Sequence, residues 1–201
     1  MLPPVIKFTR AVCASALALC LCTVTEARNR LALVIGNDSY QTVTKLRNAG
    51  ADADTMAAAF KAAGYTVTIR KDRNLRDFKD DVRDFRAKIT RGDEVVFYFS
   101  GHGVSLGAAT HLLPIDVRDQ TEAQVADDSL ALNDVLGQFA EAKPALTLAI
   151  IDACRDNPFP PKPGRSFTSR GLTPSNSGST GQMVIYSAGN LQKALDRLSN
   201  T

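Results

Sequence analysis

Two short stretches of this sequence, residues 94–99 and 146–151, are almost entirely apolar. A strand that is apolar along its whole length is typical of a parallel sheet that is covered on both faces. Parallel strands need long crossover connections, which are usually helices. The two stretches therefore favour folds built around a buried, mostly parallel sheet.

The rest of the sequence alternates between strand-like and helix-like segments, which indicates an α/β fold. Residues 75–89 space their apolar side chains at intervals of three and four, as in an amphipathic helix, and Gly64 is a stop signal for the helix before it. The chain is long enough for one domain with its own core. The pattern predicts strands at 31–35, 65–69, 94–99, 146–151 and 183–186, helices at 50–63, 75–89, 129–140 and 191–198, an extended piece at 112–115 and a long loop at 157–181.

Residues that could take part in catalysis follow both apolar stretches, at positions where we expect turns. Residues 100–103 read Ser-Gly-His-Gly, and residues 152–154 read Asp-Ala-Cys. Ligands of parallel sheets bind outside the carboxyl ends of the strands, so we expect His102 and Cys154 to lie at one rim of the sheet. A cysteine with a histidine base nearby is the raw material of a nucleophilic site.

The first 27 residues have the three parts of a secretory signal peptide. Lys7 and Arg10 accompany an apolar stretch at 11–24, and small residues precede a cleavage site after Ala27. This stretch is shorter than the ~20 residues of a membrane span, although an uncleaved membrane anchor is the alternative. We therefore expect a mature domain over residues 28–201 in the periplasm or outside the cell, with no membrane contact in the mature form.

The distribution of the cysteines singles out Cys154. The chain has four cysteines, and the other three, Cys13, Cys20 and Cys22, all fall in the leader. An exported chain with one cysteine cannot close an internal disulfide, so its thiol is either reactive or an intermolecular link. The alternative is a small buried hydrophobic residue with no chemical role.

Composition and motif spacing exclude several classes of function. The net charge of +3 gives no strong basic field, so nucleic acid is not an expected partner. Gly101 and Gly103 lack the third glycine of a dinucleotide-binding loop. The histidines and the cysteine are too scattered for a zinc site. His111 has no companion base or ligand, and we expect it at the surface or in a loop.

Taken together, these residues resemble the caspase-like cysteine peptidases (peptidase C14), in particular their bacterial metacaspase or orthocaspase branch. The His102 and Cys154 motifs follow one another in the order and at about the spacing described for caspases. Residues 33–37 and 46–53 resemble the family's first strand and first helix. The resemblance implies a three-layer caspase–hemoglobinase fold and a catalytic dyad of His102 and Cys154. It also implies an oxyanion hole formed by the backbone N–H groups of Gly103 and Cys154.

The resemblance further implies an acidic substrate pocket, whose positions match Asp52, Ser100 and Asp152. Carboxylates bind Arg or Lys side chains, so we expect cleavage of protein or peptide substrates after Arg or Lys. For Asp52 the alternative is a solvated residue in the first turn of a helix. Arg165 and Arg170 in the long loop are candidate sites of self-cleavage.

Two further expectations concern a calcium site and the C-terminal end of the domain. Many metacaspases respond to calcium, and Asp116, Asp127 and Asp128 match part of such a cluster, although the last two also suit a helix cap. No other cofactor is required. Relatives usually continue past the last strand, so we expect the domain to lack its C-terminal end. The alternative function is a non-catalytic caspase-like module that binds peptides or partners.

Overall fold

The computed structural model describes residues 28–118, 121–154, 158–159 and 181–187. The predicted leader, most of the loop at 157–181, the helix at 191–198 and the candidate cleavage sites Arg165 and Arg170 lie outside the described residues. Within the described ranges, no helix combines the length and the apolar character needed to cross a membrane.

Five parallel strands form the centre of the structure, in the spatial order β2, β1, β3, β6 and β7. All five correspond to predicted strands. Their bounds are β1 Arg30–Gly36, β2 Thr66–Lys71, β3 Glu94–Leu106, β6 Leu146–Cys154 and β7 Gln182–Tyr186. The helices are α1 Ala49–Ala62, α2 Leu75–Arg86, α3 Glu122–Asp127 and α4 Leu132–Ala140.

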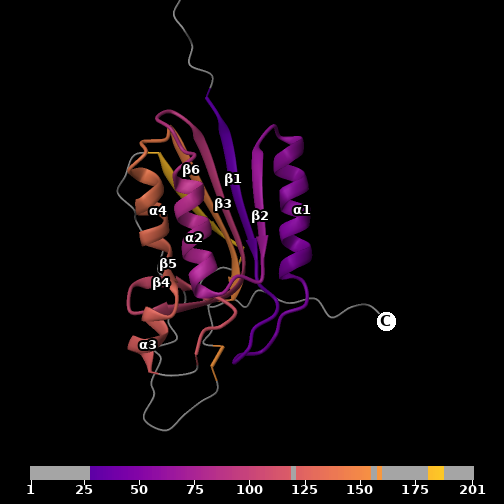
Figure 1. The fold of residues 1–201 in the computed structure, drawn as a ribbon, viewed down its shortest axis with the longest axis vertical. Helices are drawn as coiled ribbons and strands as arrows, with labels where there is room; N and C mark the ends of the chain where they lie inside the picture. Colours follow the sequence, from indigo (N-terminus) through magenta and orange to yellow (C-terminus); the bar gives the residue numbers. More distant parts are fainter. Residues whose placement is uncertain (1–27, 119–120, 155–157, 160–180, 188–201) are drawn as a thin grey trace, which may run out of the picture.

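The side chains of β1 alternate between the two faces of the sheet and so define the layers. Leu33 and Ile35 pack in a core cluster with α2 and α4, whereas Ala32 and Val34 pack with α1. Figure 1 shows α1 on one face of the sheet and α2 and α4 on the other. Both faces of the central strands β1 and β3 are therefore covered, and the predicted three-layer α/β fold is confirmed.

β3 is longer than the predicted strand because the Ser-Gly-His-Gly segment continues it. The strand runs on to Leu106, and the chain reverses at Gly107, whose φ of 60° suits a residue without a side chain. The strand β4 (Ala109–Leu112) then pairs antiparallel with β3, and β5 (Leu130–Ala131) pairs antiparallel with β4. The turns expected at residues 100–103 and 152–154 are therefore wrong, since β3 continues through the first motif to Leu106 and β6 continues through the second to Cys154.

The segment between β4 and α4 differs most from the prediction. It contains the helix α3, which the sequence analysis missed and which begins with a capping box. The helix expected at 129–140 begins only at Leu132, because the two residues before it pair with β4. Asp128 is not a cap at the start of this helix: it is the C-cap of α3, and Ala131 is the N-cap of α4.

His111 is a buried strand residue, so its expected place at the surface or in a loop is wrong. It lies on β4 with 8% of its surface exposed, and its Nδ1 is 2.9 Å from the hydroxyl oxygen of Ser129. Burial lowers the pKa of His111, and the carboxylate of Asp134 opposes this effect only in part. The histidine therefore joins β4 to the segment that follows α3.

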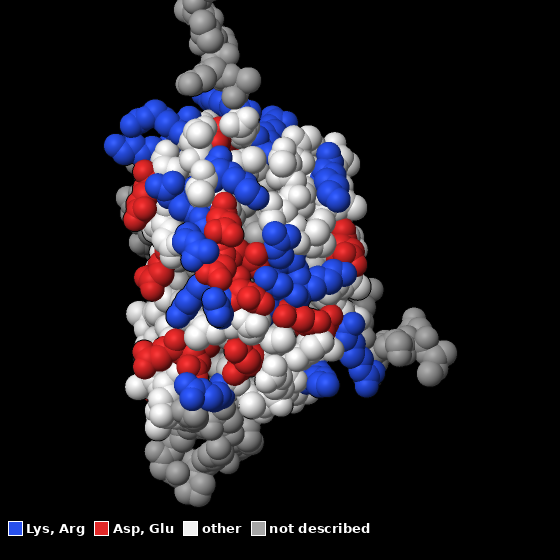
Figure 2. Space-filling model, in the orientation of Figure 1, with Lys and Arg blue, Asp and Glu red and all other residues white. Residues whose placement is uncertain are grey.

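Charged side chains of both signs lie next to one another over α2, on the face shown in Figure 2. Asp81 of α2 forms two of these pairs, at 2.8 Å with Nε of Arg70 and at 2.7 Å with Nε of Arg73. The backbone of Arg73 also bonds to Asn37 and Ile115. The ion pairs therefore hold the connection between β2 and α2 close to the carboxyl ends of the strands.

Candidate active site

The two chemical motifs meet because β3 and β6 start in register and run parallel. Glu94 pairs with Leu146 at the beginning of the ladder, and His102 pairs with Cys154 at its end. Both motifs therefore lie at the same edge of the sheet, the carboxyl edge at which parallel sheets bind ligands. The backbones of the predicted nucleophile and the predicted base are direct neighbours.

The imidazole of His102 is buried and held by the chain that follows β1. Only 7% of its surface is exposed, and its Nε2 is 2.7 Å from the carbonyl oxygen of Thr44. A carbonyl oxygen can only accept, so Nε2 carries the hydrogen and Nδ1 holds the lone pair of the neutral ring. This tautomer has Nδ1 as the nitrogen that can take up a proton.

Residues 37–48, here called the β1–α1 loop, are anchored at both ends by carboxylates. Asp38 accepts hydrogen bonds from the N–H groups of Ala49 and Gly50, at 2.8 and 2.7 Å, and so ties the loop to the start of α1. Asp72 accepts from the N–H groups of Asp38 and Ser39 and from the Ser39 hydroxyl. Burial alone would raise the pKa of Asp72, but these hydrogen bonds outweigh it and lower the pKa. The loop that holds His102 is therefore itself fixed.

The predicted oxyanion donors are backbone groups on neighbouring strands. Gly103 continues β3 and pairs with Leu112 of β4, while Cys154 ends β6 and pairs with His102. The two residues are thus one position apart in register. Their role as donors stays a prediction.

The carboxylate of Asp152 lies among hydroxyl groups at the same rim. Its Oδ2 accepts from the Tyr98 hydroxyl at 3.2 Å, and its Oδ1 accepts from the Ser187 hydroxyl at 2.5 Å. Burial raises the pKa of Tyr98, and the negative charges of Asp152 and Asp52 raise it further. Ser100, which is 4% exposed, pairs with Asp152 across β3 and β6. The structure thus brings the three predicted pocket residues to one place, around the Tyr98 hydroxyl.

Four residues of this site were missed by the sequence analysis: Tyr40, Thr44, Tyr98 and Ser187. Alternation along β3 could have found Tyr98. It lies two residues before Ser100 and four before His102, and side chains at these spacings on a strand share one face. The other three come from a loop or a strand end, where no periodic signal exists. Only the folded chain brings them to the histidine and the carboxylate.

Two of the three candidate calcium residues have hydrogen-bond partners within the protein. Oδ1 of Asp116 accepts from the N–H of Leu75 at the start of α2, at 2.8 Å. Asp128 forms a bidentate pair with Arg118, at 2.7 and 2.9 Å. Among the residues that the structure describes, no group of three or more His, Cys, Asp or Glu is arranged to hold a metal ion. The calcium site therefore gains no geometric support and stays a prediction.

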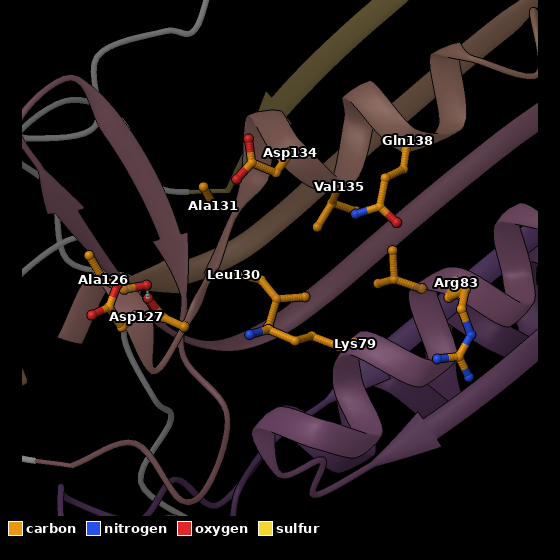
Figure 3. A pocket seen from close by; sticks show the side chains of 11 residues that line it. Lys79, Arg83, Ala126, Asp127, Leu130, Ala131, Asp134, Val135 and Gln138 are labelled. Atoms are coloured by element: carbon orange, nitrogen blue, oxygen red, sulfur yellow. Dashed lines mark hydrogen bonds between the residues drawn. The ribbon is translucent and has the colours of Figure 1, made fainter. Parts of the chain in front are cut away.

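A separate cavity of about 500 Å³ lies between α2, α4 and the α3–β5 segment. Figure 3 shows Lys79 and Arg83 of α2 on one side and Asp134 and Gln138 of α4 on the other, with Asp127 at one end. The lining contains no residue of the predicted dyad or acidic pocket. It consists of Lys79, Val82, Arg83, Ala126, Asp127, Ser129, Leu130, Ala131, Asp134, Val135 and Gln138.

Two curated proteins and one solved structure are similar to part of this chain. The chain is 22% identical over 129 residues to the human mucosa-associated lymphoid tissue lymphoma translocation protein 1, and equally to its mouse homologue. The match covers 64% of this chain but only 15% of those proteins, so the chain spans a small part of their length. The solved structure of protein GSU0716 from Geobacter sulfurreducens is similar with a TM-score of 0.49 and 21% identity, over 63% of this chain and 50% of that one.

The match to a family model covers much more of the chain. The model of the caspase domain matches residues 29–198, which include the whole described sheet, both motifs and the β1–α1 loop. The fold and the order of the motifs agree with this match. The chain therefore belongs to the caspase-domain family of cysteine peptidases, peptidase C14.

Proposed function

We propose that this chain is a cysteine endopeptidase in which Cys154 is the nucleophile and His102 the general acid and base. The register of β3 and β6, which makes the two backbones direct neighbours, is the observation that carries the proposal. A thiol with the usual pKa of about 8.5 is only a few per cent ionised at neutral pH, so it needs a base beside it. The neutral imidazole of His102, with its lone pair on Nδ1, is suited to that role.

In the proposed reaction, His102 takes the proton of the Cys154 thiol, and the resulting thiolate attacks the carbonyl carbon of the peptide bond. The backbone N–H groups of Gly103 and Cys154 donate to the oxyanion that forms. His102 protonates the leaving amine, which leaves an acyl-enzyme, and then takes a proton from the water that hydrolyses it. The carbonyl oxygen of Thr44 stabilises the imidazolium whenever His102 holds the extra proton, because it accepts from Nε2–H.

We further propose that cleavage follows Arg or Lys. Two neutral hydroxyls donate to Asp152, and among the described residues no Lys or Arg lies within ion-pair distance of it. Asp52 adds negative charge at the same point, since both carboxylates act on the Tyr98 hydroxyl. A substrate cation would supply the missing counter-charge, and Arg can bind both oxygens of a carboxylate at once.

The reaction as proposed needs no cofactor, and we expect turnover without added calcium. Asp116 and Asp128 already have partners within the protein. Turnover measured in calcium and in EGTA tests this point. Activity that disappears in EGTA and returns with calcium would restore Asp116, Asp127 and Asp128 as candidate ligands.

We also propose that the protein is an exported member of the bacterial metacaspase branch. The leader pattern of residues 1–27, with its cleavage site after Ala27, supports export, and the resemblance of the His102 and Cys154 motifs supports the branch. N-terminal sequencing of the exported protein is the test, and we expect it to begin at Arg28. A protein that keeps its leader and sediments with membranes would favour the anchored alternative.

The peptidase proposal is tested with three proteins and three fluorogenic peptides. Wild type, Cys154→Ala and His102→Ala are incubated with peptides that end in Arg, Lys or Asp before the reporter group. We expect turnover of the Arg and Lys peptides by the wild type alone. Turnover of the Asp peptide alone would refute the acidic pocket. Binding without Cys154-dependent turnover would refute the enzyme and favour the binding module.

A further inference from the structure

β3 pairs with β6 as far as His102, but its pairing with β1 and β4 has a gap at this residue. β3 pairs with β1 as far as Ser100 and with β4 from Gly103 onward. Gly101 and His102 lie between these ladders and belong to neither of them. A backbone N–H that is buried without a partner costs free energy comparable to a lost hydrogen bond, so something else must bond to His102 here.

The hydroxyl group of Tyr40 takes the place of the missing strand. Its oxygen accepts from the backbone N–H of His102 at 2.8 Å, and its hydrogen is donated to the carbonyl oxygen of Leu113 at 3.1 Å. The N–H of Leu113 donates in turn to the carbonyl oxygen of His102 at 3.0 Å. One phenol thus connects β3 at the histidine to the residue that follows β4.

Tyr40 fits this gap closely. It is 1% exposed, and its ring centroid lies 4.6 Å from that of His102 at an angle of 53°. A Cβ atom on Gly101 would lie 2.7 Å from the Tyr40 hydroxyl oxygen and 2.8 Å from Cζ of Phe99. The glycine before the histidine therefore makes room for Tyr40. Burial raises the pKa of Tyr40, which keeps the phenol neutral and able to donate and accept together.

Tyr40 and Thr44 hold the same histidine from one loop. Tyr40 bonds to the backbone of His102 and contacts its ring, whereas the Thr44 carbonyl bonds to the far nitrogen of that ring. Because the loop is anchored by Asp38 and Asp72, these contacts are set before a substrate arrives.

We propose that Tyr40 is a positioning residue of the active site, which holds the imidazole of His102 in place beside Cys154. The proposal deepens the proposed peptidase function and rests on it for its kinetic consequence. Tyr40 touches neither substrate nor reacting atoms in this role. It acts through the backbone and the ring of His102.

The kinetic test compares Tyr40→Phe with a matched control, Tyr65→Phe. Tyr40→Phe keeps the ring and removes the hydroxyl. Tyr65→Phe removes a hydroxyl in the same way on another part of the fold, where the Tyr65 ring makes an edge contact with Phe60. A misplacement of about 1 Å can reduce a rate ~100-fold, so we expect kcat of Tyr40→Phe to fall roughly 10- to 100-fold. KM should change by less than about twofold, because the substrate contacts remain. Tyr65→Phe should match the wild type.

The second readout does not depend on turnover. The chain has two histidines, so the imidazole ¹⁵N spectrum of Cys154→Ala is simple, and His111→Gln assigns it. We expect Tyr40→Phe in this background to shift the His102 resonances and to leave those of His111 in place. The amide hydrogen of His102 should exchange slowly while Tyr40 keeps its hydroxyl, which can be measured even if Tyr40→Phe does not fold.

The outcomes separate the two proposals. A loss of kcat together with a shift of the His102 resonances supports the positioning role. A kcat within about twofold of wild type, with unchanged His102 resonances, overturns it. An amide of His102 that exchanges as fast as an exposed loop amide overturns it as well. A wild type without any turnover would refute the peptidase proposal, while the His102 resonances would still test whether Tyr40 positions the imidazole.

Discussion

The replacement Asp152→Asn tests the substrate pocket most directly. Asp152 accepts from Tyr98 and Ser187 with one lone pair of each oxygen, which leaves acceptor capacity on both oxygens for a substrate cation. Asn keeps the shape but removes the charge and one of the two acceptors. One hydroxyl then faces an NH₂ group and has to turn away.

The magnitude follows from the position of this carboxylate. Two unit charges 4 Å apart attract by about 4 kcal/mol at an effective dielectric constant of about 20, before desolvation is subtracted. Hydrogen bonds to charged groups contribute about 1.5–3 kcal/mol net, so we take this range for the loss. At about 1.4 kcal/mol per tenfold change, kcat/KM for an Arg peptide should fall roughly 10- to 150-fold.

The assay compares two peptides that differ only in the residue before the cut, Arg or norleucine. Asp152→Asn should lower kcat/KM for the Arg peptide and leave the norleucine peptide nearly unchanged. Asp134→Asn, which removes a carboxylate at the separate cavity of α4, is the control and should behave like the wild type. An Arg-to-norleucine ratio that is the same in Asp152→Asn and in the wild type would refute the reasoning.

Three further predictions concern stability and are read from thermal and urea unfolding. Gly36→Ala should destabilise the fold by about 1–3 kcal/mol, because a Cβ there would overlap the carbonyl oxygen of Ala49 in α1. Gly137→Ala is the control, since a Cβ there meets open space and should stabilise α4 by about 0.5–1 kcal/mol. Equal effects of the two replacements on the free energy of unfolding would contradict the packing at Gly36. Phe139→Ala removes a buried ring that contacts two other aromatic rings and should cost about 3–5 kcal/mol, and a loss below about 1 kcal/mol would argue against this core. Hydrogen bonds from Thr90 and Asn29 outweigh the burial of Asp93 and lower its pKa in the folded state. Its contribution to the free energy of unfolding is therefore present above the unfolded pKa of about 3.9 and is lost as the pH falls below that value. Asp93→Asn should make the stability depend less on pH in this acid range, and an unchanged pH dependence would speak against the assignment.

The parallel core could be predicted because its signal is local. Residues 146–151 are apolar on both faces, and a segment of that kind is stable only between two helical layers. Helix α2 was equally visible from its apolar spacing, although it ends at Arg86 and not at residue 89. From parallel strands alone it followed that His102 and Cys154 would meet at one rim, and they are register partners.

His111 shows where local reasoning stops. Nothing near it in the sequence indicates burial, because the partner that holds it, Ser129, is 18 residues away in a segment that the pattern assigned to a helix. Strand β5 consists of two residues, too few for any alternation to be seen. Both errors have the same cause, a short antiparallel pairing that is stabilised by contacts across the fold.

By itself, the sequence determined the layers of this protein and the edge of the sheet where its chemistry lies, because hydrophobic periodicity and strand direction are properties of neighbouring residues. Only the tertiary structure decided which residues hold the histidine and the carboxylate at that edge. Tyr40 and Thr44 reach His102 from 62 and 58 residues away, and Tyr98 and Ser187 hold Asp152 from 54 and 35 residues away. Such contacts depend on how loops and strand ends close over the sheet, and they leave no periodic trace in the chain.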